Sequence, residues 1–169
     1  YTVIAADPRP VSVLHLPFGF RDGTRTVGYY DNARQYYQTL HGKPLIGGYL
    51  SRLTRNQVSR QRRSKILRTL ILLSEGAPYT PAAPHVLRDR GAVFARRTRL
   101  GYVVVDRASA SPELVAYAVS SFALERIDGD DVYDLYRCTV PLGPAPPDGQ
   151  LPAIAHARGV TTAFGLPPR

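Results

Sequence analysis

The residues whose types and spacing could do chemistry gather in one stretch, YYQTLHGKPLIGGYLSR at positions 36–52. Basic and hydrogen-bonding side chains alternate there with glycines at positions 42, 47 and 48. Backbone N–H groups at glycine turns, together with basic side chains, can hold a phosphate or a carboxylate. The stretch therefore suggests an anion site. Its candidate residues are Gln38, His41, Lys43, Gly47, Gly48, Tyr49 and Arg52.

Two interpretations of this stretch are open. In the first, the side chains of Gln38, His41, Lys43, Tyr49 and Arg52 converge on an anion, whose charge favours the protonated form of His41 and makes binding sensitive to pH. In the second, the glycines only let the chain turn and pack, and His41 and Lys43 lie in solvent. The residue types alone favour packing, because glycine and proline usually serve structure.

The net charge of +9 is concentrated in and just after this stretch. Between Asn32 and Ser74 there are nine Lys and Arg residues and no acidic residue, whereas the rest of the chain holds 13 basic and 13 acidic residues. Such a block favours an anionic partner, namely lipid headgroups, a phosphate-bearing substrate or nucleic acid, although a solvated basic face is equally compatible with it. Nucleic acid is the least favoured partner, because no recognisable reading module accompanies the charge.

Motifs for catalysis, cofactors and metals are missing. There is no Gly-x-Ser-x-Gly elbow, no Walker loop, no Gly-x-Gly-x-x-Gly after a strand and no His-Glu-x-x-His, so we expect neither catalysis nor a cofactor in this chain. Cys138, the only cysteine, excludes an internal disulfide and a cysteine zinc site. His15 lacks a second ligand at metal spacing, and residues 128–131 lack the remainder of a calcium loop.

The elements that must position the stretch can be predicted around it. Tyr30, Ala33, Tyr37 and Leu40 predict an amphipathic helix over residues 30–40, which Gly42 and Pro44 end. The apolar run at residues 11–16, bounded by prolines, predicts a buried strand. The following residues 18–28 are expected to form a loop with a turn at Asp22 and Gly23, on the ligand side of an α/β sheet.

Further elements follow in the second half of the chain. Ile66, Leu70 and Leu73 predict a helix that Gly76 ends, and residues 84–91 predict a short one. The valine-rich strand at residues 100–106 ends in Asp106, either a functional carboxylate or a cap for the next segment. Ser111 is an N-cap residue for a helix that reaches about residue 123. Strands at residues 124–127 and 132–138 then flank a hairpin turn.

These elements predict an α/β fold: a single three-layer domain with a mixed, mainly parallel sheet and a closing β-hairpin. We assign residues 1–140 to this domain and residues 141–169 to a proline-rich linker and tail. The composition, with 44% hydrophobic and 21% charged residues, is typical of a soluble globular protein. No apolar run reaches the roughly 20 residues of a membrane helix, and the chain lacks methionine even at position 1, which suggests a piece of a longer polypeptide.

Several segments together resemble the C-terminal extracytoplasmic domain of multi-pass bacterial membrane proteins related to the glycosyltransferase C superfamily. Members show a strand ending in proline, like VLHLPFG at residues 13–19, and a tyrosine-rich helix leading into Gln-Thr-x-His-Gly-Lys-Pro and Gly-Gly-Tyr-x-Ser-Arg, as at residues 36–52. The strands YVVVD at residues 102–106 and VYDLYR at residues 132–137 are similar to later segments of the family. The resemblance covers residues 3–138.

The resemblance implies an accessory or substrate-binding domain on the extracytoplasmic side of the cell membrane. Its partner would be the membrane-spanning part of its own parent chain, with anionic lipid and sugar phosphates as further candidates. The catalytic acidic residue of such transferases lies in the membrane-embedded part, so no catalytic residue is carried over and the activity of the parent protein stays open. The alternative function is a soluble basic module that binds polyanions, either nucleic acid or anionic lipid.

Overall fold

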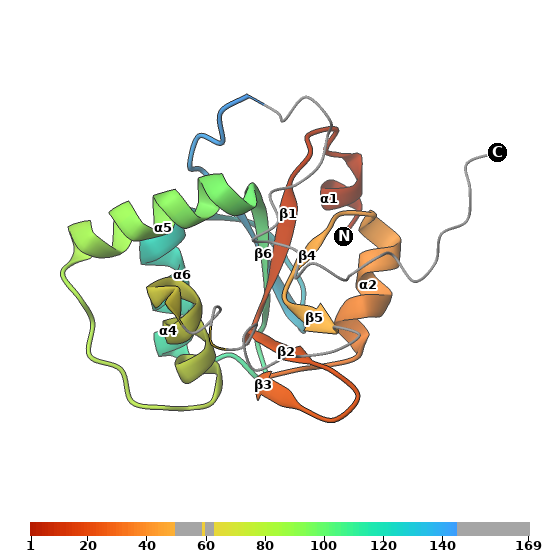
Figure 1. Cartoon of the computed structure of the whole chain (residues 1–169). Coiled ribbons are helices and arrows are strands. Elements are labelled where there is room, and N and C mark those ends of the chain that lie inside the picture. The colour runs from red at the N-terminus through yellow and green to blue at the C-terminus, as the bar shows by residue number, and fades with distance from the viewer. Residues whose placement is uncertain (50–58, 60–62, 145–169) are drawn as a thin grey trace.

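The computed structural model describes residues 1–49, 59 and 63–144 (Figure 1). A mixed five-stranded sheet runs through the centre of the molecule. Its strands, in spatial order, are β4 (Leu45–Ile46), β1 (Ser12–Leu16), β6 (Leu100–Asp106), β8 (Tyr133–Cys138) and β7 (Leu124–Gly129). Strand β1 is parallel to β4 and β6, and β8 is antiparallel to β6 and β7. The predicted α/β class, mixed sheet and closing hairpin are confirmed.

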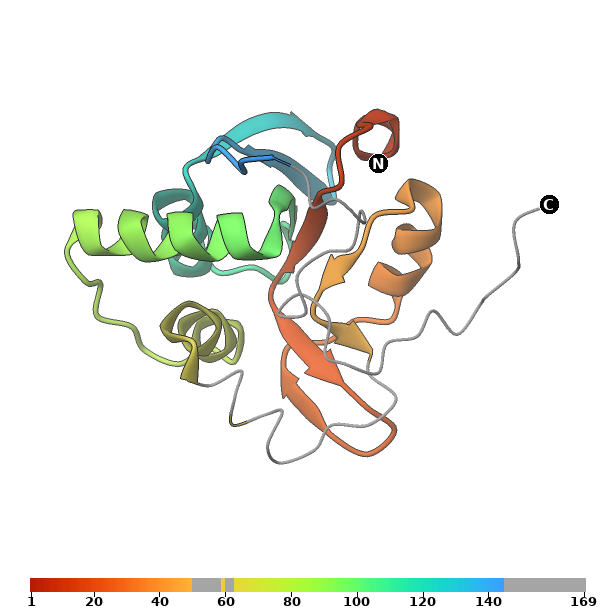
Figure 2. The same cartoon turned by 45° about the horizontal axis from the view of Figure 1, so that its top comes forward.

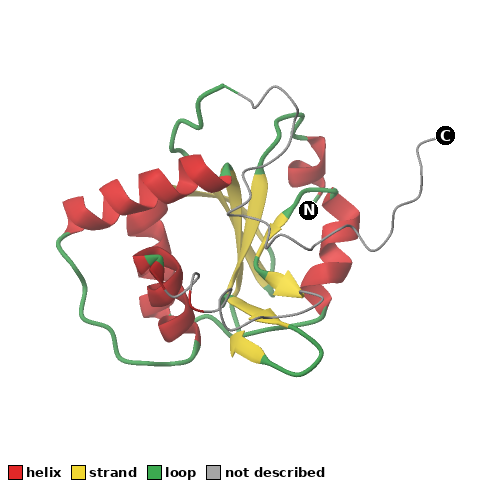
Figure 3. Ribbon diagram, in the orientation of Figure 1, coloured by secondary structure: helices red, strands yellow, loops and turns green. Residues whose placement is uncertain are grey.

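Helices cover both faces of this sheet and complete three layers (Figures 2 and 3). One face carries α4 (Lys65–Ser74), α5 (Pro84–Thr98) and α6 (Pro112–Phe122), and the other carries α1 (Thr2–Ala6) and α2 (Ala33–His41). Strand β1 shows the alternation, because Leu14 and Leu16 join the core under α4 to α6 while Val13 joins the smaller core with Ile4 of α1. His15 therefore points toward the layer of α1 and α2.

The segment predicted as a loop after β1 is instead a hairpin, and that prediction was wrong. It consists of β2 (Gly19–Arg21) and β3 (Thr26–Gly28), and β5 (Gly48–Tyr49) joins β2 to form a second, three-stranded sheet. The predicted turn at Asp22 and Gly23 explains the hairpin, because Asp22 Oδ1 accepts hydrogen bonds from the N–H groups of Thr24 at 2.7 Å and Arg25 at 2.6 Å.

Helix ends mostly follow the sequence signals. The Ser111 hydroxyl caps α6 by accepting from Leu114 N at 3.2 Å, and Gly42 closes α2 with a left-handed φ of 64°. Helix α5, however, continues to Thr98 although the sequence predicted an end near Gly91. Gly91 lies where α5 crosses α6. A larger residue at this position would clash with the backbone of α6, which explains why a glycine occurs inside the helix.

The buried face of α2 differs from the prediction. Leu40, predicted to face the core, is 51% exposed, whereas Arg34 and His41 are only 7% and 4% exposed. The helix begins at Ala33, so Tyr30 lies outside it, and aromatic and polar side chains rather than aliphatic ones fill the space between α2 and the sheet. A pattern of apolar residues could not predict such a face.

The chain still contacts the domain beyond its last strand, β8. Leu142 packs against the core cluster that contains Ile4, and Arg99 Nη1 donates to Pro144 O at 3.0 Å, so the chain stays attached to the domain as far as the description extends. The boundary placed at residue 140 stays a prediction, and residues 145–169 of the tail lie outside the described residues. None of the described helices has both the length and the apolar character that crossing a membrane requires.

Candidate anion-binding site

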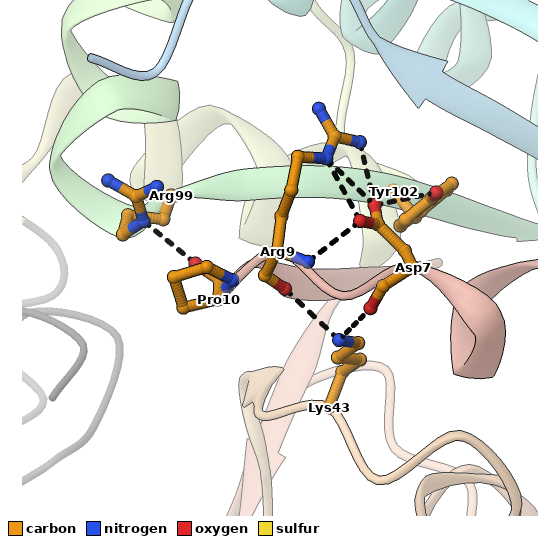
Figure 4. A network of polar contacts seen from close by, with 6 residues as sticks. All are labelled: Asp7, Arg9, Pro10, Lys43, Arg99 and Tyr102. Carbon is orange, nitrogen blue, oxygen red and sulfur yellow. Dashed lines mark hydrogen bonds and ion pairs between the residues drawn. The ribbon is translucent and has the colours of Figure 1, made fainter. Parts of the chain in front are cut away.

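The predicted stretch is divided between several elements. Gln38 and His41 belong to the last turns of α2, and Lys43 follows the left-handed Gly42. Lys43 Nζ donates to the carbonyl oxygens of Asp7 and, at 3.0 Å, Arg9 (Figure 4). The structure thus brings Gln38, His41 and Lys43 together, but the ammonium group of Lys43 already binds backbone of the N-terminal segment.

The surroundings of Lys43 form a structural network (Figure 4). Arg9 binds the Asp7 carboxylate through Nε and Nη2, and Tyr102 Oη donates to Asp7 Oδ2 at 2.9 Å. The hydrogen bonds from Arg9 hold the pKa of Asp7 well below its usual range. Arg99 Nε donates to Pro10 O at 2.7 Å on the other side. Lys43 therefore acts here with residues that attach the segment after α1 to the sheet.

The glycine pair and Tyr49 lie elsewhere. Gly47 has a φ of 96°, and a Cβ atom at this position would lie 2.8 Å from both Gly19 O and the Phe18 ring. Gly47 therefore allows close packing, as the second interpretation expected, whereas a Cβ atom at Gly48, which has the same φ, would meet no atom within 4 Å. The same interpretation placed His41 in solvent, which is wrong, because His41 is only 4% exposed. Tyr49 is in β5, with its ring centroid 6.4 Å from that of Tyr30. Arg52 lies outside the described residues, so the convergence of Gln38, His41, Lys43, Tyr49 and Arg52 on an anion stays a prediction.

A different cluster of polar side chains, buried or half-buried, lies between α2 and β1. We call it the polar layer; it consists of Tyr1, His15, Arg34, Tyr37 and His41. The Tyr1 ring stacks on Tyr37 at a centroid distance of 4.5 Å, with His41 at 5.9 Å and His15 at 6.2 Å. Arg34 and His41 are seven residues apart, so they share one face of α2 about 10 Å apart along the axis.

Arg34 is the unusual member of the polar layer. Its Nη1 donates to the carbonyl oxygen of Pro17, directly after β1, and its guanidinium carbon lies 5.2 Å from the centroid of the Tyr29 ring. Within the described part of the chain, no carboxylate lies within 4.0 Å of the guanidinium, and Nη2 is buried without a hydrogen-bond partner. Burial lowers the pKa of Arg34, while Asp31 and Asp106 act on it only from a distance.

The two histidines of the polar layer are neutral at pH 7. His41 Nδ1 accepts a hydrogen bond from Lys43 N at 3.0 Å, so the proton of the neutral ring lies on Nε2. This Nε2 is a buried donor without an acceptor among the described residues. Burial lowers the pKa of His41 to about 4 and that of His15 to about 3. Without a ligand, His41 thus titrates below the range that the anion interpretation expected.

Unsatisfied donors make the polar layer a candidate site. Arg34 Nη2 and His41 Nε2 are both donors, and Tyr1 Oη and His15 Nε2 are also buried without partners in the described chain. A buried donor without an acceptor costs about 1–3 kcal/mol, and more if it is charged. An anion placed against Arg34 would remove part of this cost. The guanidinium adjoins the carboxyl end of β1, the edge at which open α/β sheets bind ligands.

The rim of this edge comes from loops after β3 and β6. Tyr29, which covers Arg34, lies with its hydroxyl 3.2 Å from Ser109 Oγ. Asp106 Oδ1 accepts from the N–H groups of Ala108 and Ser109, and Oδ2 accepts from Ser109 Oγ at 2.9 Å. Asp106 therefore caps its own loop, which was one of its two predicted roles. In the described residues, no three His, Cys, Asp or Glu side chains are grouped to hold a metal ion.

Arg34, Tyr1 and Tyr29 were not predicted as site residues from the sequence. One signal was present, because Arg34 and His41 are spaced by two helical turns and must share a face. No protein-family model, curated protein or solved structure was found to match this chain. No matched relative therefore assigns a role to the polar layer.

Proposed function

We propose that this chain is an accessory, ligand-binding domain, and that Arg34 in the polar layer holds the anionic group of its ligand. One observation carries the proposal: a guanidinium that is only 7% exposed has a free Nη2 and no carboxylate within 4.0 Å in the described chain. Burying an unpaired cation is costly. A ligand that pairs with the cation gives a reason for a sequence to carry that cost.

The surroundings of Arg34 indicate the kind of ligand. Guanidinium groups favour phosphate and carboxylate, whose oxygens accept hydrogen bonds in the plane of the donor groups. Aromatic side chains accompany the cation, since Tyr29 lies over it and the rings of Tyr37 and Tyr133 are 5.5 Å apart in an edge-to-face arrangement. Such rings provide contact area for the organic part of a ligand. A small organic phosphate or carboxylate satisfies both requirements.

The family resemblance of residues 3–138 supports a location and a partner for this domain. In this role the domain lies on the extracytoplasmic side of the cell membrane, joined to the membrane-spanning part of its own parent chain, which resembles transferases that use lipid-linked sugars. Sugar phosphates are therefore the ligands to test first. A fusion of the full-length gene to a reporter that is active only outside the cytoplasm tests the location, and an inactive, stable fusion would reject it.

Binding to Arg34 can be tested with two soluble probes, inorganic phosphate and glucose 1-phosphate. Isothermal titration should show binding of one of them to the wild type and a loss of at least about tenfold for Arg34→Gln, equivalent to one charge-assisted hydrogen bond. Arg68→Gln is the matched control, because Arg68 is exposed on α4, on the opposite face of the sheet. Equal affinity for wild type and Arg34→Gln, or no binding of either probe, would refute the proposal.

A further inference from the structure

The excess of positive over negative charge in the described chain lies in the segment that includes α4 and α5. Residues 63–98, which include α4 and α5, hold seven Lys and Arg and two acidic residues. The remaining described residues hold nine basic and ten acidic residues and nearly cancel. All seven basic side chains are exposed. They are Arg63, Lys65, Arg68, Arg88, Arg90, Arg96 and Arg97. None of them forms an ion pair within the described part of the chain.

Two exposed aliphatic side chains lie among these cations. Leu72 is 40% exposed on α4, one helical turn after Arg68. Val93 is 42% exposed on α5, between Arg90 and Arg97 on the same side of the helix. Both helices belong to the same layer over the central sheet (Figure 3). We call the exposed side of α4 and α5, with Arg63 just before α4, the basic surface; it comprises the seven cations with Leu72 and Val93.

We infer that the basic surface docks onto an anionic lipid bilayer. Its cations complement acidic headgroups, and long Arg side chains can reach the headgroups while their methylene stems lie against apolar material. Leu72 and Val93 provide aliphatic groups that can enter the interface between headgroups and acyl chains. The surface therefore combines the electrostatic and apolar contributions that peripheral membrane binding requires.

Nucleic acid fits the same surface less well. Proteins that bind single strands supply aromatic rings on which bases stack. Of Phe, Tyr and Trp, helices α4 and α5 contain only Phe94, which is buried in the core, so the imidazole of His85 is the one exposed aromatic ring on these two helices. Aliphatic side chains between cations would be desolvated by a bilayer but would meet the polar backbone of a nucleic acid. The observed composition thus favours lipid over nucleic acid.

The inference is independent of the proposed ligand site. Arg34 lies in the layer of α1 and α2, and the basic surface lies on the other face of the sheet (Figure 2). A docked domain would hold its basic surface against the bilayer while α2 stays on the far side of the sheet. Substitutions on one side should leave binding on the other side unchanged, so failure of one proposal can be told from failure of the other.

Vesicle co-sedimentation tests the inference. We expect wild-type protein to bind vesicles of phosphatidylcholine with phosphatidylglycerol, to bind pure phosphatidylcholine vesicles weakly, and to lose affinity as salt rises. The triple variant Arg68→Gln, Arg90→Gln, Arg97→Gln should lose at least about tenfold in affinity. The matched control removes three exposed arginines elsewhere on the surface: Arg21→Gln, Arg25→Gln, Arg137→Gln.

A second variant, Leu72→Ser with Val93→Ser, keeps every charge and tests the apolar contribution. It should reduce the binding that persists at high salt. Near-UV and far-UV circular dichroism identify variants that fail to fold. Three results would overturn the inference: equal binding to both kinds of vesicle, equal losses in the control and the test triple, or salt-sensitive binding to short DNA without any dependence of vesicle binding on Leu72 and Val93.

Discussion

In the ligand-free domain, Arg34 should lower the free energy of unfolding. Its charge is buried without a carboxylate within 4.0 Å in the described chain. Arg34→Met removes the charge and keeps most of the side-chain volume, at the loss of the hydrogen bond to Pro17 O. Replacing a buried ionic group by a well-packed apolar one is often neutral or stabilising by about 1–4 kcal/mol. We therefore expect an unchanged or raised free energy of unfolding in urea, together with loss of phosphate binding.

Arg9→Met provides the contrast to this prediction. Arg9 binds the Asp7 carboxylate at 2.7 Å, so its removal leaves Asp7, which is nearly buried, with fewer partners and should lower the free energy of unfolding. If Arg34→Met destabilises the protein as much as Arg9→Met does, Arg34 is a structural residue and the account of the polar layer fails.

The histidines of the polar layer predict how stability depends on pH. Burial lowers the pKa of His41 to about 4 and that of His15 to about 3, so the unfolded chain binds more protons than the folded domain as pH falls below about 6.5. Stability should therefore be fully present above pH 6.5 and fall as pH drops toward 4, by at most about 1.4 kcal/mol per pH unit for each histidine. Urea unfolding measured between pH 7 and pH 5 checks this.

The source of that pH dependence can be isolated with His15→Phe, which keeps an aromatic ring in place of the imidazole. The slope of unfolding free energy against pH should become smaller in this variant. His85→Phe is the control, because His85 is exposed at the start of α5. A wild-type slope of zero between pH 7 and pH 5, or the same slope in His15→Phe, would contradict the assignment.

Single residues show where the sequence was informative and where it was not. The helix end at Gly42 and the cap at Ser111 were predicted, because both depend on neighbours in sequence. The role of Lys43 was not predicted, because its acceptors are carbonyl oxygens of residues 7 and 9, more than 30 positions away in the sequence. Isolation of Arg34 from carboxylates is likewise a property of the folded chain, which no local pattern contains.

At the scale of elements, the crossing of α5 and α6 depends on Gly91. A Cβ atom at this position would lie 1.6 Å from Ser121 O, a backbone atom of α6. Gly91→Ala should therefore force the helices apart and destabilise the domain by about 1–3 kcal/mol, despite the better helix propensity of alanine. Thermal unfolding measures the change.

Gly23→Ala is the matched control for this crossing. The nearest atom to a Cβ at Gly23 is Tyr49 Oη at 3.7 Å, an ordinary contact distance, so we expect a change of a few tenths of a kcal/mol. A Gly91→Ala variant as stable as Gly23→Ala would show that the two helices do not approach as closely as described.

The elements also show the limits of pattern recognition. Strands β1 and β6 were predicted because buried parallel strands are continuous apolar runs. Strands β2, β3, β4 and β5 have only two or three residues each, too few to produce an alternating pattern. Helix α5 was predicted too short because Gly91 was interpreted locally, whereas its reason is a contact with α6.

On the scale of the whole molecule, the central sheet separates two surfaces with different chemistry. The α/β class and the closing hairpin followed from the order of the predicted elements, and the structure confirms both. The sequence placed the excess charge between Asn32 and Ser74, which includes α4 but not α5. That the basic residues of α5 lie in the same layer as α4, opposite the polar layer, required the fold. We propose a domain that docks through one surface and binds its ligand through the other.

The central claim is that an anion binds Arg34, and NMR can observe this side chain directly. The measurement is a titration of ¹⁵N-labelled protein with glucose 1-phosphate, following the Nε–Hε signal of Arg34 and the ring signals of His41. The account predicts saturable shifts of the Arg34 signal in the wild type and in Arg68→Gln, with smaller shifts of the His41 ring signals along the same face of α2, and no His41 shifts in Arg34→Gln. Signals of the polar layer that stay in place, or that shift equally in Arg34→Gln, would contradict it.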